Sequence, residues 1–267
     1  MLGLGKALRL QKLFNAKSGT SVIIPMDHAV EGYYAELEDP CSLVTSMAEA
    51  GANGFLMRRG LAALTRDYFG GAGWVQRITG RSGSGPKDNQ QLVVASVEQA
   101  LRNGADAVAP TIFLGGDLDD QALPMFGQIS DKCAELGMPL LAEVFPASGP
   151  DSVPYDGPYT VDEMRIVVRT ACEEGCDLIK TWYSGDPASF RKIVDYSTVP
   201  LLVAGGPKAA NERDVLETVK GAMDAGAKGA IFGRKIWQSP NPAAMVRAVC
   251  LIVYEGADVT RAMNELG

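Results

Sequence analysis

Eight short apolar runs, each followed by a stretch with helical periodicity, constrain the fold of this chain more than any other feature of its sequence. The runs are nearly continuous in Val, Ile, Leu, Phe and Ala rather than strictly alternating. Such strands are typical of a parallel sheet covered by helices. The expected strands are residues 21–27, 54–57, 74–79, 107–113, 139–145, 178–183, 200–206 and 229–233.

The segments between the runs carry small or apolar residues at spacings of three and four, and several end in Gly just before the next run. AGAN, NGAD, EGCD and AGAK repeat this helix-end signal four times. Eight such units closing on themselves predict an α/β fold, a single (β/α)8 TIM barrel. A doubly wound open sheet is the alternative, and it fits less well because no GxGxxG turn is present.

Residues 1–267 are expected to form one domain, because no linker divides the chain and α/β barrels often reach this length. Residues 80–91, rich in Gly, Ser and Pro, read as an excursion after the third strand. Residues 1–19 interleave Lys and Arg with Leu at helical spacing and lack the features of a signal peptide. They predict an amphipathic N-terminal helix that covers one end of the barrel.

The composition argues against several classes of partner. The formal net charge is −7 and the basic residues are scattered, so neither a nucleic acid nor a membrane surface is expected as a partner. No apolar run reaches the ~18 residues of a membrane span, and a cytoplasmic location is expected. Cys172 and Cys176 share a helix face, but no second pair completes a zinc pattern. Neither a metal nor a cofactor is therefore expected.

Two glycine turns stand where barrels of this kind often bind phosphate, after the seventh and eighth strands. Gly205 and Gly206 follow the seventh strand in VAGGPK, and Gly233 and Arg234 follow the eighth in FGRKIWQ. Glycine lets the backbone approach a ligand closely, and its N–H groups can point at an anion. Arg234 and Lys208 would add positive charge. The two turns together predict a site for one phosphate group.

The first strand ends in Asp27 and His28, the only histidine of the chain. A satisfied structural carboxylate and a packed imidazole are the alternatives to a functional role. The sixth strand carries Lys180, with Leu178 and Trp182 on the same face by period-two alternation. A lysine paired with a carboxylate is one interpretation. The other is an amine whose pKa is lowered by desolvation and nearby positive charge, so that it attacks a carbonyl and forms a Schiff base.

These motifs resemble the archaeal-type class I fructose-bisphosphate aldolase family. VIIPMDHAVEG, IKTWYSGD, VAGGPK and GAKGAIFGRKIWQ stand in the order typical of that family over almost the whole chain. The resemblance implies that Lys180 is the Schiff-base lysine and that Asp27 assists proton transfer and orients sugar hydroxyls. It also implies that the glycine turns and Arg234 hold the phosphate of a ketose phosphate, and that the protein is a homo-oligomer.

One departure from the family pattern concerns proton transfer. Relatives carry a tyrosine in a YPRG stretch that closes the fifth strand, whereas this chain reads VFPASG, with Phe145 in the tyrosine's place. Glu143 shares the inward face with Phe145, and near Lys180 its pKa is expected to move toward neutrality for acid–base work. A simple counter-ion for Lys180 or Arg59 is the alternative for Glu143. Tyr183 and Tyr155 are weaker candidates.

Three functions remain open at this point. The first is a Schiff-base-forming aldolase or transaldolase that acts on a phosphorylated keto sugar of the dihydroxyacetone phosphate type. The second is a thiolase-like acyl transfer from a phosphorylated diketone. The third is a phosphosugar-binding barrel without catalysis. All three take a phosphorylated small molecule as the partner.

Overall fold

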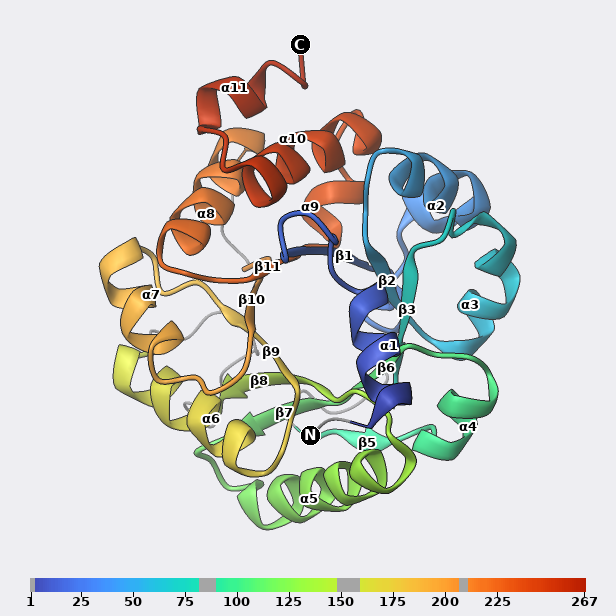
Figure 1. Cartoon of the computed structure of the whole chain (residues 1–267), viewed down its shortest axis with the longest axis vertical. Coiled ribbons are helices and arrows are strands. Elements are labelled where there is room, and N and C mark those ends of the chain that lie inside the picture. Colours follow the sequence, from blue (N-terminus) through green and yellow to red (C-terminus); the bar gives the residue numbers. More distant parts are fainter. Residues whose placement is uncertain (1–2, 82–89, 148–158, 207–210) are drawn as a thin grey trace.

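Parallel strands form a closed ring at the centre of the molecule, and helices surround it (Figure 1). The computed structural model describes residues 3–81, 90–147, 159–206 and 211–267. Each strand of the ring runs parallel to its neighbours, which confirms the predicted (β/α)8 TIM barrel. The strands of the ring are β1 Ser21–Pro25, β2 Gly54–Met57, β3 Gly73–Arg77, β6 Ala107–Ala109, β7 Thr111–Leu114, β8 Leu141–Pro146, β9 Leu178–Trp182, β10 Leu201–Ala204 and β11 Gly229–Ile231.

The fourth strand of the barrel differs from the prediction because it is broken at Pro110. Its first half, β6, pairs with β3, and its second half, β7, pairs with β8, so the two halves together close the ring. Proline has no N–H to donate to a ladder. Its carbonyl still accepts a hydrogen bond of 3.1 Å from the N–H of Glu143. Eight units therefore yield nine strand segments.

The helices begin and end at the residues that the sequence marks. Side-chain oxygens cap several N-termini, and Thr160 forms a reciprocal capping box with Glu163. The glycines of all four predicted helix-end tetrapeptides have positive φ, a conformation that favours glycine. The longer helices are α2 Pro40–Glu49, α3 Arg59–Thr65, α4 Val97–Arg102, α5 Asp119–Leu136, α6 Val161–Glu173, α7 Pro187–Val194, α8 Glu212–Asp224 and α10 Pro242–Glu255. Shorter ones are η1 His28–Val30, η2 Ala35–Leu37, η3 Arg66–Tyr68, α9 Arg234–Trp237 and α11 Val259–Met263.

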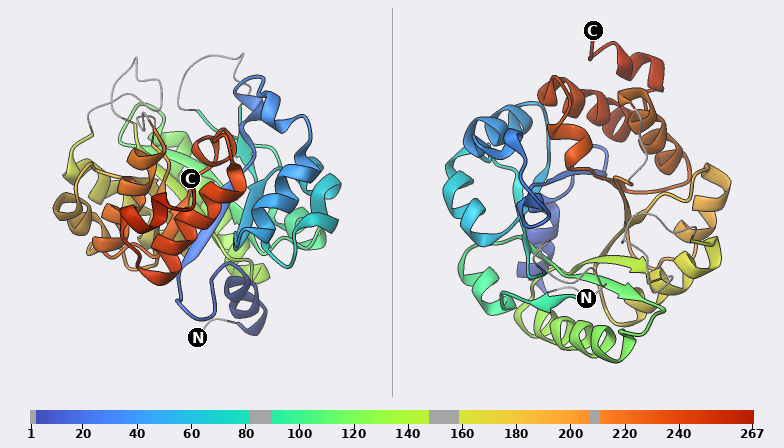
Figure 2. Two further views of the ribbon diagram at one scale, coloured as in Figure 1. Left: turned by 90° about the horizontal axis from the view of Figure 1, so that it is seen from above. Right: turned by 180° about the vertical axis from the view of Figure 1, so that it is seen from behind.

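An apolar plug fills the amino-terminal half of the barrel interior. Inward side chains of successive strands pack there in one buried cluster with Leu13. Helix α1 (Leu4–Lys12) lies below this end of the barrel (Figure 2), and Leu10 and Phe14 pack against the plug. The predicted amphipathic cover is therefore confirmed. The name apolar plug refers below to the strand residues of this cluster, which are Ile23, Leu56, Val75, Ala107, Ala109, Leu141, Leu178, Leu202 and Ile231.

The predicted excursion after the third strand begins with a small antiparallel ribbon. Thr79–Gly80 (β4) pairs with Leu92–Val93 (β5), so the third strand of the ring ends at Arg77 rather than at residue 79. Within the described part of the chain, none of the helices is both long and apolar enough to cross a bilayer.

Candidate active site

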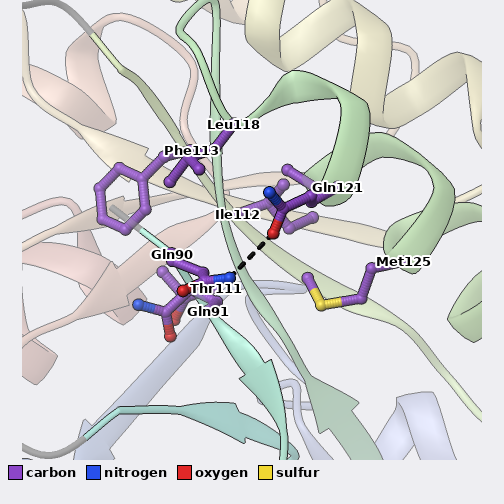
Figure 3. A pocket seen from close by; sticks show the side chains of 9 residues that line it. Gln90, Gln91, Thr111, Ile112, Phe113, Leu118, Gln121 and Met125 are labelled. Atoms are coloured by element: carbon purple, nitrogen blue, oxygen red, sulfur yellow. Dashed lines mark hydrogen bonds between the residues drawn. The ribbon is translucent and has the colours of Figure 1, made fainter. Parts of the chain in front are cut away.

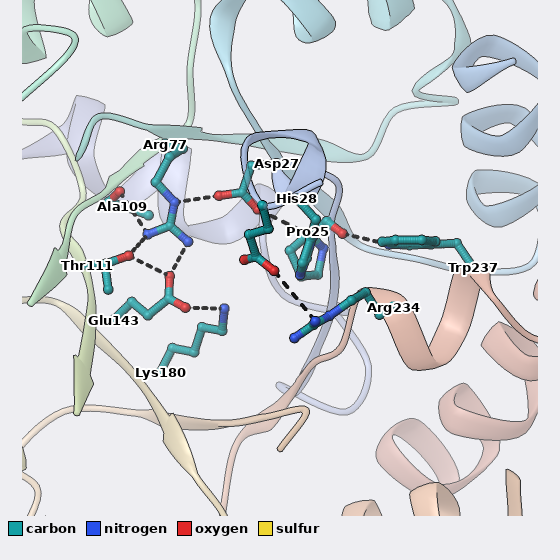
Figure 4. A network of polar contacts seen from close by, with 11 residues as sticks. Pro25, Asp27, His28, Arg77, Ala109, Thr111, Glu143, Lys180, Arg234 and Trp237 are labelled. Atoms are coloured by element: carbon teal, nitrogen blue, oxygen red, sulfur yellow. Dashed lines mark hydrogen bonds and ion pairs between the residues drawn. The ribbon is translucent and has the colours of Figure 1, made fainter. Parts of the chain in front are cut away.

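The barrel interior changes from apolar to charged within one step along several strands. Side chains two residues apart point to the same side of a strand. Arg77, Glu143 and Lys180 each follow a residue of the apolar plug by two positions, so they face inward above it. With Asp27 and Thr111, they form a cluster of polar contacts at the carboxyl ends of the strands (Figure 4). We call these five residues the polar network.

Lys180 lies inside the barrel, only 7% exposed. Its Nζ donates a hydrogen bond of 2.6 Å to Oε1 of Glu143, on the adjacent strand β8. On the other side, Lys180 is in register with Leu202 of β10, the strand that leads into Gly205 and Gly206. The amine therefore has a carboxylate within proton-transfer distance and belongs to the strand beside the first glycine turn.

Arg77 holds the polar network together, although the sequence analysis did not single it out. Its Nε donates to Oδ2 of Asp27 at 2.6 Å. Its Nη2 donates to Oε2 of Glu143, and its Nη1 donates to Oγ1 of Thr111. One buried guanidinium therefore bridges the carboxylates of the first and fifth barrel strands. A charged residue two positions after Val75 in an apolar strand was the signal that could have found it.

The electrostatics of the polar network keep its carboxylates ionised. Burial raises the pKa of Glu143, but Arg77 and then Lys180 lower it by more, so the pKa lies below its ordinary value. The expected shift of the Glu143 pKa toward neutrality is therefore wrong. Burial also raises the pKa of Asp27, and the Arg77 guanidinium reverses that effect and lowers it. In the opposite sense, burial lowers the pKa of Arg77, but Glu143 and Asp27 raise it by more.

His28 packs at the seam where the first and last strands of the barrel meet. Its Nδ1 is 3.8 Å from Oδ1 of Asp27 and has no hydrogen-bond partner among the described residues. Its ring meets Trp237 edge to face, with 5.6 Å between the centroids. Burial lowers the pKa of His28 to about 4, so the imidazole is neutral at pH 7. Trp237 Nε1 donates to the carbonyl of Pro25 at 3.0 Å and ties the last barrel unit to the first strand.

The two glycine turns lie at the same end of the barrel as the polar network. A Cβ at Gly233 would lie 2.6 Å from both His28 Cε1 and the Pro25 carbonyl oxygen, so no larger residue fits there. A Cβ at Gly205 would lie 2.9 Å from the Phe232 ring. Position 206 shows no such crowding by the described residues. Close packing therefore explains why positions 233 and 205 are glycine, whereas no described residue crowds position 206.

Arg234 opens the single-turn helix α9, beside the second glycine turn. Its Nη1 is 3.5 Å from Oε2 of Glu31, a residue that the sequence analysis did not consider. Burial raises the pKa of Glu31, and Arg234 lowers it in part. An incoming phosphate would compete with this carboxylate for the guanidinium. The predicted Lys208 and the loop residue Tyr155 lie outside the described residues.

Aromatic rings line the wall where relatives are expected to carry a tyrosine. Phe145 stacks on Trp182 with 4.0 Å between centroids and contacts Phe113 at 5.7 Å. This wall has no proton to transfer at position 145. Tyr183 faces outward, as predicted, and its ring meets Phe190 of α7. It lies away from the polar network.

Arg59 does not serve as a counter-ion of Glu143. Its Nη1 bonds the Gln99 side chain at 2.7 Å and the Val94 carbonyl at 3.2 Å, and the side chain is exposed. That alternative in the sequence analysis is therefore wrong as to Arg59, and Arg77 takes the place beside Lys180.

A small pocket adjoins the polar network between β7 and α5 (Figure 3). Thr111 lines it and also donates to Oε2 of Glu143 at 3.3 Å. Gln90 Nε2 donates to Gln121 Oε1 at 2.8 Å across its mouth. The pocket therefore offers uncharged polar groups next to the candidate acid–base residue. In the described part of the chain, no group of three or more His, Cys, Asp or Glu side chains is arranged to hold a metal ion.

Comparison with known proteins decides the family. The model of the DeoC/LacD family aldolases matches residues 21–239. The chain belongs to this aldolase family. The aldolase is 32% identical to the 2-amino-3,7-dideoxy-D-threo-hept-6-ulosonate synthase of Halobacterium salinarum over 100% of this chain and 98% of the relative.

Solved structures extend the likeness to three dimensions. An archaeal fructose 1,6-bisphosphate aldolase superposes with a TM-score of 0.83 at 28% identity, covering 94% of this chain and 100% of that one. A second archaeal structure, with its catalytic lysine covalently bound to the carbinolamine intermediate of the substrate, gives 0.82 at 28% identity, covering 93% and 99%. The aldolase described here is thus an enzyme of a family with Schiff-base-forming members.

Proposed function

We propose that this aldolase uses Lys180 to form a Schiff base with a keto phosphate of the dihydroxyacetone phosphate type, and joins that ketone to an aldehyde or catalyses the reverse cleavage. One observation carries the proposal: a buried lysine amine lies 2.6 Å from a carboxylate inside the barrel, on the strand next to a glycine turn. The related synthase and fructose-bisphosphate aldolases support the same chemistry.

The chemical steps follow from the polar network. The protonated amine gives its proton to Glu143 and adds to the ketone carbon, and loss of water from the resulting carbinolamine leaves an iminium ion. A carboxylate then removes a proton from the adjacent carbon, because the iminium draws the electrons of that C–H bond. The enamine attacks the aldehyde carbon, the new alkoxide takes up a proton, and water releases the product from Lys180.

The roles of the carboxylates follow from their partners. Glu143 contacts the Lys180 amine directly, so we assign proton transfer at the Schiff base to it. Asp27 is held by Arg77 as an ionised acceptor, which suits it to orient substrate hydroxyl groups. Gly205, Gly206, Gly233 and Arg234 are the proposed phosphate site, with neutral His28 beside it.

Borohydride trapping tests the proposal. We expect the aldolase, incubated with dihydroxyacetone phosphate and reduced with sodium borohydride, to acquire a stable secondary amine at Lys180, identified by peptide mass spectrometry. The Lys180→Met variant is the control and should acquire no adduct while still binding inorganic phosphate. An unmodified Lys180 in the wild-type chain at saturating ligand would contradict the proposal.

A thiolase-like acyl transfer is the second candidate, favoured by Phe145, which supplies no proton at the place of the family tyrosine. It would show as thiol-dependent cleavage of a phosphorylated diketone without a trapped adduct from dihydroxyacetone phosphate. The one-domain organisation, the homo-oligomeric state and the cytoplasmic location expected from the sequence stay predictions.

A further inference from the structure

Arg58 projects into the mouth of the barrel, and no described residue forms a hydrogen bond or an ion pair with it. It follows β2 and lies two residues after Leu56 of the apolar plug, so its side chain faces the interior. Its Nε is buried and has no hydrogen-bond partner among the described residues. A Cβ at Gly80 would lie only 2.9 Å from Arg58 Cζ, so glycine at position 80 leaves the room that the guanidinium occupies.

In the part of the chain that the structure describes, the charge of Arg58 has no ion-pair partner, whereas the charge of Arg77 does. Met57 is in register with Gln76, so Arg58 and Arg77 are neighbours on the same face of adjacent strands. Arg77 is paired with two carboxylates. Among the residues that the structure describes, no carboxylate is in ion-pair contact with Arg58. Burial lowers the pKa of Arg58, Asp27 raises it in part, and Arg77 lowers it again. A bound anion would therefore stabilise the charged form of the guanidinium.

The ring order places Arg58 across the mouth from Lys180. Counting β6 and β7 as one strand, β2 lies four strands from β9 in either direction around the eight-stranded ring. The proposed phosphate site follows β10, which is next to the strand of Lys180, and β11, which lies midway between β9 and β2. A substrate whose ketone is bound to Lys180 and whose phosphate lies at these turns leaves the opposite part of the mouth, around β2 and β3, to its other end, and the Arg58 guanidinium lies there beside Gly80.

We propose that Arg58 binds an oxyanion, a carboxylate or a phosphate, carried by the acceptor aldehyde at the end remote from its aldehyde carbon. The inference rests on the proposed function and names the substrate class of the same site: an aldehyde with a terminal anionic group. A guanidinium offers parallel N–H groups that match either oxyanion, and it remains charged in a partly buried setting. Arg58 is thus a specificity-determining residue distinct from the phosphate site at Arg234.

Matched pairs of aldehydes test this assignment. With dihydroxyacetone phosphate as the ketone, kcat/KM is measured for glyceraldehyde 3-phosphate against glyceraldehyde, and for succinic semialdehyde against its methyl ester. We expect Arg58→Gln to reduce the preference for the charged member of at least one pair by about 10- to 100-fold. The pair that changes tells phosphate from carboxylate. Arg59→Gln removes the same charge from the neighbouring, outward side chain and should leave both preferences within about twofold of wild type.

Two outcomes would overturn the inference: an unchanged preference in Arg58→Gln, or an equal loss in Arg59→Gln. Borohydride trapping with dihydroxyacetone phosphate involves no aldehyde and therefore reports on the proposed function separately. If the adduct forms and the preferences do not move, only the role of Arg58 is lost. If no adduct forms, calorimetric titration with inorganic phosphate decides the matter: two sites per chain are expected, one of them lost in Arg58→Gln and the other in Arg234→Gln. A single site unaffected by Arg58→Gln would refute the assignment.

Discussion

The same strands form both halves of the barrel interior, yet the half at their amino-terminal ends is apolar and the half at their carboxyl ends is charged. On β9 the change occurs between Leu178 and Lys180, and on β8 between Leu141 and Glu143. The apolar plug stabilises the fold because its side chains are removed from water. The polar network instead costs desolvation, which its internal ion pairs offset. On these strands a residue that stabilises the fold therefore stands two positions before a residue of the proposed chemistry, and substitutions should separate the two effects.

Replacing Lys180 with Met is the substitution with the largest expected effect. Loss of the amine that contacts Glu143 and is proposed to form the Schiff base should reduce turnover on the order of 10⁴-fold or more. Glu143 keeps its bond to Arg77, so the free energy of unfolding should change far less than the rate. Steady-state kinetics and urea unfolding of the same preparation give both numbers. Residual turnover within tenfold of wild type would show that the chemistry lies elsewhere.

Replacing Arg77 with Met should destabilise the fold, because it removes the ion pairs that hold the polar network above the apolar plug. Two carboxylates, the buried Glu143 and the half-buried Asp27, would lose their shared partner, and breaking a buried ion pair typically costs about 3–5 kcal/mol of stability. Both carboxylates have lowered pKa values in the folded chain, so their contribution is present above the ordinary carboxyl pKa and is lost as the pH falls. The deficit of the variant should therefore shrink toward acid. Arg59→Met is the control and should stay within about 0.5 kcal/mol of wild type. A deficit that does not depend on pH would contradict this account.

Truncating Leu178 to Ala should show the reverse of the lysine variant. The side chain is fully buried in the apolar plug, and its loss should reduce the free energy of unfolding by about 2–5 kcal/mol. The Lys180 adduct with dihydroxyacetone phosphate should still form at a temperature where the variant is folded. Thermal unfolding and borohydride trapping provide the two readouts. A variant that stays folded but cannot be trapped would mean that the two halves are not separable.

The pH dependence of stability should identify His28 as a neutral base at the seam between the first and last strands. Its pKa falls from 6.5 in the unfolded chain to about 4 in the fold. Below pH 6.5 the unfolded chain takes up a proton that the folded chain does not. The free energy of unfolding therefore decreases as the pH is lowered, by about 3 kcal/mol between pH 7 and pH 4. Unfolding free energies between pH 7 and 4 measure this slope. Because His28 is the only histidine, His28→Asn should flatten it between pH 6.5 and 5, and an unchanged slope would argue against the burial of the imidazole.

The smallest effect is expected at the aromatic wall. If Glu143 is the group that transfers the proton, Phe145→Tyr should change turnover by less than about tenfold, because the added hydroxyl is not needed for the reaction. A gain of 10²-fold or more, the usual contribution of a positioned acid or base, would show instead that the missing tyrosine limits the rate. Steady-state kinetics with the preferred aldehyde distinguishes the two cases.

The sequence predicted the barrel because its signal is repeated eight times, and Lys180 because a charge inside an apolar strand is conspicuous. The break at Pro110 was missed because apolar residues continue on both sides of it. Arg77 was missed although it obeys the same rule as Lys180, two positions after a plug residue. The same alternation, counted from Leu56, selects Arg58 rather than Arg59. The pKa of Glu143 depends on Arg77 from a distant strand, which no local pattern reveals.

The seam between β1 and β11, fastened by the Trp237 bond to Pro25, has a consequence for synthesis on the ribosome. Asp27 emerges early, but the strand that flanks it on one side is among the last parts of the barrel to be translated. Until then the first strand presents an unpaired edge, a known risk for aggregation. The proposed reaction centre of the nascent chain therefore stays incomplete until translation has passed α9.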